Sequence, residues 1–396
     1  MVSIRTWGKY AVAGLLLAGM SLTAVAADKP AHNPMLHQHG MRIVDAEDQP
    51  VQLRGVNLGG WLVWEGWIFG KGILTPQATI VSRLQQAAGP RETEQFRAQV
   101  YDTFIDEADI AKIAAAGFNS VRVPLHYCLF DDDAGWKLLD RVLVRCERHR
   151  LYAILDLHMV PGSSLGQQER DPIWTSEKSR SKVVKLWKAI ALRYRQRKIV
   201  AGYDLINEPL PPSGKELVSV YKQIIGAIRE VDRDHLLFIE GGKFASDFSM
   251  FDKPLDGNQV YSFHMYTWFG DDRKKKLAEY VSLARRDDVP LWAGEFGENT
   301  YPMLDSTVAM YAQCPEIVGW SYWTWKKAAG HFPGLVTIRV PRNWAKVIDW
   351  VASFLGNNRP DAATVNNGIK EFLEAAKLKN CDYDQRMERI LLRKEN

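Results

Sequence analysis

Short apolar runs rich in β-branched and aromatic residues alternate with amphipathic stretches along most of the chain. The runs predict eight strands, at 51–57, 120–126, 152–158, 203–209, 236–241, 260–266, 291–297 and 318–325. In the stretches between them, apolar residues recur every three or four positions, which predicts helices within 104–117, 137–150, 181–196, 215–232 and 343–356. Such alternation favours right-handed β-α-β units and a parallel sheet.

Eight parallel strands are the number that closes into a barrel, so we predict an α/β fold, a (β/α)8 TIM barrel forming one catalytic domain over residues 41–360. The alternative, an open doubly wound sheet, usually carries G-x-G-x-x-G after its first strand, where this chain has GVNLGG. We expect an N-terminal hairpin within 41–58 and an insertion after strand 1, at 58–102, over the barrel mouth. Residues 361–396 are predicted to form a trailing helix and a charged tail.

The N-terminus has the features of an export signal. Arg5 and Lys9 precede an apolar run that ends in the small residues Ala24-Val25-Ala26. This pattern predicts that residues 1–26 are a secretory signal peptide, with an uncleaved anchor as the alternative. Residues 27–40 are then a loose leader. We expect a secreted or periplasmic protein with no stable membrane insertion after cleavage.

Two further residue types bear on metals and disulfides. His37 and His39 form an H-x-H pair, but they lie in polar leader sequence and not at a strand end, so we predict no metal site. In an oxidising compartment the four cysteines allow three pairings, and zero to two disulfides are compatible with the sequence. These cysteines are Cys128, Cys146, Cys314 and Cys381.

Composition narrows the class of protein. Of the 396 residues, 46% are hydrophobic and 25% charged, which excludes a mainly disordered chain and a polytopic membrane protein. The net charge of +4 gives no electrostatic reason to expect nucleic-acid binding. The 14 tryptophans are many, and they suit a large core or a groove that stacks flat ligands. We expect a monomer.

Most of the predicted strands end in polar or aromatic residues. In a β/α barrel the C-terminal ends of the strands form the reactive face, so these side chains should meet there as a polar, aromatic-lined pocket. They are Asn57, Arg122, His126, Asp156, His158, Asn207, Glu208, Glu240, His264, Tyr266, Glu295 and Trp323.

Two of these residues, Glu208 and Glu295, form a pair suited to glycoside hydrolysis. One carboxyl group protonates the leaving oxygen while the other attacks the anomeric carbon, and a separation of about 5–5.5 Å favours the retaining pathway. Glu208 as acid/base needs a raised pKa, which the charge of Glu295 can supply. Glu295 as nucleophile must stay ionised, with Arg122 and the Tyr266 hydroxyl as its partners, and Asn207 can bond the sugar 2-hydroxyl. The alternative is two rim glutamates in unrelated salt bridges.

The same residues lie in an ordered set of motifs, RGVNLGGW, FNSVRVP, DLH, INEP, HMY, GEFG and GWSYWTW, within residues 41–356. This set resembles glycoside hydrolase family 5, the retaining (β/α)8 family of endoglucanases, exo-1,3-glucanases and mannanases. The resemblance implies that Glu208 is the acid/base and Glu295 the nucleophile. It also implies a −1 sugar subsite formed by Arg122, His158, Asn207, His264, Tyr266 and Trp323.

The segment GVNLGGWLVWEGW is similar to the exo-1,3-glucanase branch, where the glutamate at the position of Glu65 binds sugar. The loop DLHMVPGSS also resembles that branch, but it continues as LGQQERDPIW where the branch has the pattern PGSQNG. Trp323 can provide an apolar floor for the sugar. Further sugar platforms, or alternatively core residues, are Trp61, Trp64, Trp67, Trp174, Trp268 and Trp325.

We therefore predict a retaining β-glycosidase acting on a β-glucan-type polysaccharide or oligosaccharide. Double displacement would pass through a covalent glycosyl-enzyme at Glu295 and requires no metal or organic cofactor. One alternative is a transglycosylase or hydrolase that remodels a bacterial exopolysaccharide or a glycolipid. Another is a non-catalytic carbohydrate-binding barrel. The sugar, the linkage and the choice between endo and exo attack stay open.

Overall fold

In the computed structural model, eight parallel strands close on one another in the order β10-β3-β4-β5-β6-β7-β8-β9. This closed sheet confirms the predicted (β/α)8 barrel. The structure describes residues 33–70, 75–163, 172–268, 270–353 and 356–393. Its strands are β3 (Leu53–Asn57), β4 (Ser120–His126), β5 (Tyr152–Met159), β6 (Val200–Asp204), β7 (Leu236–Glu240), β8 (Gln259–Met265), β9 (Leu291–Gly297) and β10 (Ile317–Trp323).

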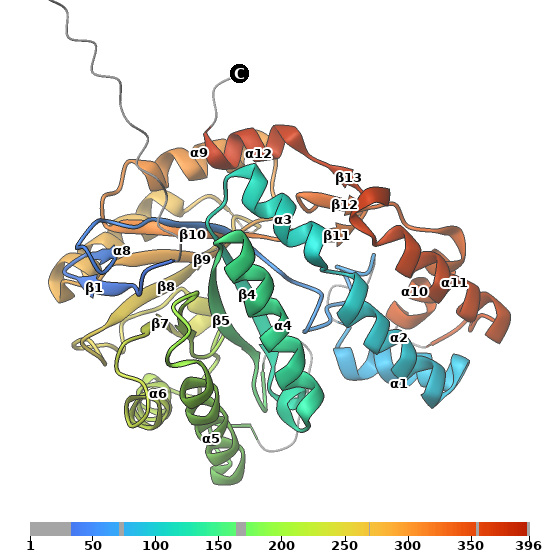
Figure 1. Cartoon of the computed structure of the whole chain (residues 1–396), viewed down its shortest axis with the longest axis horizontal. Helices are drawn as coiled ribbons and strands as arrows, with labels where there is room; N and C mark the ends of the chain where they lie inside the picture. Colours follow the sequence, from blue (N-terminus) through green and yellow to red (C-terminus); the bar gives the residue numbers. More distant parts are fainter. Residues whose placement is uncertain (1–32, 71–74, 164–171, 269, 354–355, 394–396) are drawn as a thin grey trace, which may run out of the picture. The chain divides into compact units, whose positions relative to one another are not determined.

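Helices follow the barrel strands and cover the barrel from outside. They are α3 (Glu107–Ala116), α4 (Asp133–His149), α5 (Glu177–Tyr194), α6 (Gly214–Arg229), the short α7 (Gly242–Ala245), α8 (Arg273–Asp287), α9 (Tyr301–Ala312) and α10 (Arg342–Ala352), with 3-10 turns η1 (Tyr127–Phe130) and η2 (Leu378–Asn380). Figure 1 shows barrel strands at the centre with helices such as α4, α5 and α6 outside them. In α3 the Asp106 side chain accepts hydrogen bonds from the first-turn N–H groups, and Gly117 ends the helix at φ 104°, in the left-handed region. Local capping thus agrees with the apolar pattern that predicted this helix.

The barrel interior changes character along its axis. Side chains at alternate positions of a strand point to the same face. Near the N-terminal ends, Ile154, Phe238 and Trp292 are fully buried in one apolar cluster, with the Phe238 and Trp292 rings 5.0 Å apart. Two positions further along β5 and β7, the buried residues are Asp156 and Glu240. The interior is therefore polar at the end where a barrel of this type has its active site.

The N-terminal strands differ from the predicted hairpin. β1 (His37–His39) pairs antiparallel with β2 (Arg42–Val44), so part of the predicted leader is a strand. A turn does follow β2, but it ends in the isolated bridge between Val44 and Pro50. The predicted second strand of the hairpin belongs to the barrel instead, because β3 pairs with β4 and β10 on its two sides.

The insertion and the C-terminal segment form a second layer beside the barrel. Two helices of the insertion, α1 (Gln77–Ala88) and α2 (Pro90–Thr103), pack with α10 and with α11 (Ala362–Ala375), as Figure 1 shows. The packing is aromatic and includes Phe69, Phe96, Phe104, Trp344 and Phe372. The insertion therefore contains two helices, and this apolar surface is the partner that their apolar residues need.

The last part of the chain is not a charged tail. β11 (Lys326–Ala328), β12 (Val336–Ile338) and β13 (Asp382–Tyr383) form a three-stranded sheet. α12 (Gln385–Leu392) then buries Met387 and Leu391 and packs with α9. The apolar spacing within this short helix accounts for the difference from the prediction.

The structure bears on the predictions for membrane insertion and disulfides. No helix in the described part of the chain combines the length and apolar character needed to span a bilayer. Cys146, Cys314 and Cys381 carry thiols that form no disulfide, so the structure has none of the possible bridges among its described residues. The predicted signal peptide, residues 1–26, lies outside the described residues, as do residues 27–32 of the leader.

Candidate active site

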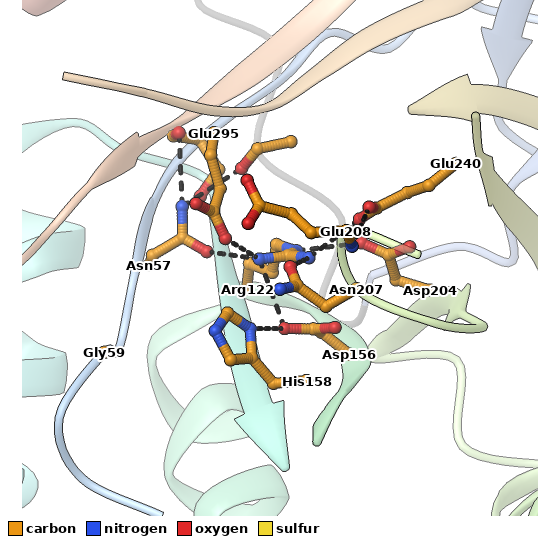
Figure 2. A network of polar contacts seen from close by, with 12 residues as sticks. Asn57, Gly59, Arg122, Asp156, His158, Asp204, Asn207, Glu208, Glu240 and Glu295 are labelled. Carbon is orange, nitrogen blue, oxygen red and sulfur yellow. Dashed lines mark hydrogen bonds and ion pairs between the residues drawn. The ribbon is translucent and has the colours of Figure 1, made fainter. Parts of the chain in front are cut away.

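One buried arginine organises the C-terminal end of the barrel. The Arg122 guanidinium has no exposed surface and is the centre of the polar network in Figure 2. Its nitrogens lie 2.8 Å from Asp204 Oδ2, 2.6 Å from Glu295 Oε1, 3.0 Å from Glu240 Oε1 and 3.2 Å from Asp156 Oδ2. A planar guanidinium can donate to several carboxylates at once, so a single cation from β4 orients acids from four other strands or their ends.

Glu295, near the end of β9, is held by two donors. Arg122 Nη1 donates to Oε1, and the Tyr266 hydroxyl donates to Oε2 at 2.9 Å. Burial raises the pKa of Glu295, while the charges of His264 and Arg122 act to lower it. The two partners that the sequence indicated for Glu295 are thus both in contact with it, and they fix the orientation of its carboxylate.

Glu208 lies four residues beyond β6 and not within a strand, because β6 ends at Asp204 where the sequence predicted a strand to 209. Its backbone N–H donates to Glu240 Oε2 at 2.6 Å, and its φ of 43° is unusual for a residue with a side chain. The Glu208 carboxylate lies 2.9 Å from His264 Nδ1. The turn therefore directs Glu208 back over the barrel axis.

The two catalytic candidates meet at one point. Carboxylate oxygens of Glu208 and Glu295 and a ring nitrogen of His264 all lie within 4.8 Å of one another. Asn207 lies in the same network, and its Oδ1 accepts a hydrogen bond of 2.8 Å from Arg122 Nη2. This geometry can place an acid and a nucleophile on either side of a single glycosidic bond.

A second group of predicted residues lies beside this pair. His158 Nδ1 is 2.7 Å from Asp156 Oδ2, and its Nε2 is 3.8 Å from Glu65 Oε1. The His158 ring stacks on Trp323, with centroids 5.4 Å apart and planes 7° from parallel. A Cβ at Gly59 would approach the rim of the Trp323 ring to 2.8 Å, so a glycine is needed there. The structure therefore places Glu65, His158 and Trp323 in one continuous wall.

Two carboxylates bond Arg122 without having been predicted to do so, and several of the tryptophans fit the core alternative. Asp204 was not singled out, and Glu240 was noted only as a strand-end residue, although both bond Arg122. Their positions at the C-terminal ends of the adjacent strands β6 and β7 were the available signal. Trp61, Trp64 and Trp325 are core residues with almost no exposed surface, whereas Trp268 is 52% exposed and stacks on Tyr266 at 4.3 Å.

Glu65 and His158 should make the stability of the protein depend on pH. Burial raises the pKa of Glu65 to about 8, although the His158 charge opposes this. Burial would lower the pKa of His158, but Asp156 raises it to about 9. Both groups bind a proton more tightly when folded, so each contributes stability at low pH that is lost as pH rises toward these values.

We therefore expect the free energy of unfolding to fall between about pH 6.5 and 8. Glu65→Gln removes one of the two titrating groups, and the fall should become shallower. Denaturant unfolding of both proteins across this range measures the effect. Parallel stability curves for the two proteins would contradict the assignment.

Comparison with known proteins decides the family. The family model for cellulase (glycosyl hydrolase family 5) matches residues 83–329, which is more than half of the chain. The chain belongs to glycosyl hydrolase family 5. This enzyme is 30% identical over 348 residues to a β-xylosidase from Phanerodontia chrysosporium, covering 76% of this chain and 72% of the relative.

Two other comparisons are informative. A probable glucan 1,3-β-glucosidase A from Aspergillus fumigatus is 30% identical over 62% of this family 5 chain, which spans 64% of that relative. The crystal structure of an endogalactoceramidase superposes with a TM-score of 0.56 at 18% identity, covering 85% of this chain and 84% of the other. The structural likeness supports the fold. Family membership makes the protein a glycoside hydrolase of retaining type.

Proposed function

We propose that this family 5 enzyme is a retaining β-glycosidase that cleaves a β-glucan-type oligosaccharide or polysaccharide. The observation that carries the proposal is the proximity of the two carboxylates, because one oxygen of Glu208 lies within 4.8 Å of one oxygen of Glu295. Retaining enzymes place these groups about 5–5.5 Å apart, whereas inverting enzymes leave about 6.5–9.5 Å for a water molecule. A gap of this size lets Glu295 reach the anomeric carbon directly.

In the first step, Glu295 forms a bond to the anomeric carbon as the bond to the leaving oxygen breaks. Glu208 gives its proton to that oxygen. In the second step, water attacks the same carbon, Glu208 takes the water proton, and the ester bond to Glu295 breaks. Each residue returns to its starting protonation state, and the sugar keeps its β configuration.

Neighbouring side chains support these steps. Arg122 and Tyr266 hold the Glu295 carboxylate toward the sugar, and Asn207 lies where it can bond the 2-hydroxyl group. Burial acts to lower the pKa of His264, but Glu240 and Glu295 raise it well above its ordinary value. A protonated His264 beside Glu208 is suited to holding its carboxyl group in place while the proton moves.

We further propose that the enzyme removes sugars from a chain end. The support is that Glu65, His158 and Trp323 are each about 3% exposed and lie against one another, so they can act as a wall on one side of the bound sugar. A β-xyloside is the second candidate substrate, because the β-xylosidase relative is 30% identical over 76% of the chain. Such a wall suits both substrates.

A substrate panel tests these proposals. We expect turnover of β-1,3-, β-1,4- or mixed-linkage glucan, or of an aryl β-glucoside or β-xyloside, with monosaccharide as the first product and the β-anomer appearing first by NMR. A chelator should leave the rate unchanged, since the reaction as written uses no metal. Initial release of the α-anomer would overturn the retaining assignment, and longer chains formed from an added oligosaccharide would indicate transglycosylation. Absence of turnover on every β-glycoside would favour a non-catalytic barrel.

We also propose that the enzyme is exported. The support is the sequence alone: two basic residues, an apolar run and the Ala24-Val25-Ala26 pattern within residues 1–26. The intact mass of the protein recovered outside the cytoplasm should correspond to a chain that starts at or just after position 27. Recovery of the full-length chain from the membrane fraction would favour the uncleaved anchor.

A further inference from the structure

A buried lysine lies directly behind the active-site wall. Lys326 is the first residue of β11 and follows Trp323 by three positions. Its side chain is fully buried, as is that of Asp109, with which it forms an ion pair of 2.7 Å. A buried ammonium group is stable only when its charge and its hydrogen-bond donors are satisfied, so its partners show what it holds together.

Lys326 joins three helices through one nitrogen. Besides Asp109 at the start of α3, Nζ donates to the carbonyl of Phe104 at 2.6 Å and to that of Ala376 at 3.0 Å. Phe104 and Ala376 are the C-cap residues, which directly follow the last residues of α2 and α11. Helix C-termini present unpaired carbonyls and a partial negative charge, which the ammonium group neutralises. All three donors of Lys326 are therefore used.

Asp109 also holds a second residue of the same segment. Its Oδ1 accepts a hydrogen bond of 2.8 Å from the indole nitrogen of Trp325. Asp109 lies in the first turn of α3, with its backbone N–H bonded to the N-cap residue Asp106. One carboxylate on a capped helix thus fixes both Trp325 and Lys326 from behind.

The segment is fixed to β3 on its other side. The Thr324 hydroxyl donates to the Asn57 carbonyl at 2.9 Å and accepts from the Gly59 N–H at 3.1 Å. The Trp325 N–H donates to the same Asn57 carbonyl at 2.9 Å. The Trp323 ring stacks on His158 and its rim lies close to Gly59, so we expect a shift of residues 324–326 to displace the ring from these contacts.

We propose that Asp109 and Lys326 are positioning residues that hold Trp323 where it contacts the sugar. Neither side chain reaches the reacting atoms, and both act through the backbone of residues 324–326. The inference rests on the proposed function, in which Trp323 is the floor of the sugar subsite. The family model ends at residue 329, so Ala376 brings a helix from outside that region into the support of the site.

A double-mutant cycle tests the proposal. The anchor variant is Asp109→Asn with Lys326→Met, because removal of the lysine alone would leave a buried carboxylate without its partner. The amide oxygen introduced by Asp109→Asn can still accept the Trp325 hydrogen bond. With folded protein verified by near-UV circular dichroism, we expect kcat/KM on an aryl β-glycoside to fall about tenfold or more, and the inhibition constant of a matching iminosugar to rise in parallel.

The second arm of the cycle introduces the anchor variant into Trp323→Ala. If the anchor acts through Trp323, it should cause little further loss in that background. Equal losses in both backgrounds would overturn the proposal, as would an anchor variant as active as wild type. If Trp323→Ala itself has wild-type activity, it is the proposed sugar floor that fails. If only the anchor variant is unaffected, the floor stands and the anchor fails.

A matched control separates positioning from general destabilisation. Asp256 forms a largely buried ion pair of 2.8 Å with Arg229, at the end of α6 and remote from the site. Asp256→Asn should lower the melting temperature while kcat/KM stays within about twofold of wild type at a temperature where the protein is folded. A loss of kcat/KM in Asp256→Asn as large as that of the anchor variant would count against a specific role for Lys326.

Discussion

Replacement of Glu295 by alanine should reduce kcat on any active β-glycoside by at least about 10⁴-fold, because it removes the group that forms the covalent intermediate. The Glu295 carboxylate is oriented by a 2.6 Å bond from Arg122 and a 2.9 Å bond from the Tyr266 hydroxyl. A water molecule in the vacated space lacks that charge and orientation. The loss should therefore appear in kcat more than in substrate affinity.

Steady-state kinetics and mass spectrometry check this expectation together. A 2-deoxy-2-fluoro glycoside with a good leaving group should label wild type on the peptide that contains residue 295, and should leave Glu295→Ala unlabelled. Glu316→Ala is the matched control, because Glu316 is also buried but bonds Arg285 just before β10 begins. It should keep near wild-type activity while folded. Activity of Glu295→Ala within tenfold of wild type would show that another residue is the nucleophile.

The strands could be predicted because each of them coincides with a local run of mainly apolar residues. β9 carries Glu295 on an apolar run that is buried on both faces, and the run at 291–297 has the same bounds as the strand. The fourth strand was predicted at 203–209, whereas β6 spans Val200–Asp204. The prediction extended too far along the chain because the apolar residues Leu205 and Ile206 continue the pattern after the strand ends. They are buried in the turn that carries Glu208. An apolar pattern indicates that residues are buried, and here the buried segment extends beyond the end of the strand.

The support of the site could not be predicted, because it depends on partners far apart in the chain. Arg122 was expected to pair with Glu295, yet it also binds Asp204 and Glu240. Lys326 has its partners on α3 and at the ends of α2 and α11, and no local pattern distinguishes it from a surface lysine. The sequence therefore indicated the reacting residues, but it did not indicate most of the residues that hold them in position.

Removal of the Glu208 carboxyl group should have an effect that depends on the leaving group. Glu208→Ala is expected to slow cleavage of a natural glycosidic bond by about 10²- to 10⁴-fold, because the leaving oxygen then departs without a proton. An aryl glycoside whose phenol is already a good leaving group needs no such proton, so the first step should be much less affected. The second step stays slow, since the water nucleophile has lost its base, and the glycosyl-enzyme should accumulate as a burst of phenol.

Azide distinguishes the two carboxylates by the configuration of its product. In Glu208→Ala, azide attacks the intermediate on Glu295, forms the bond to the anomeric carbon as the ester breaks, and gives a β-glycosyl azide after two inversions. In Glu295→Ala, azide displaces the aglycone directly while Glu208 supplies the proton, and one inversion gives the α-azide. NMR of the products reads the outcome. The opposite pair of anomers would mean that Glu208 is the nucleophile and Glu295 the acid/base, because only the residue on the α face can be replaced by an external α-face nucleophile.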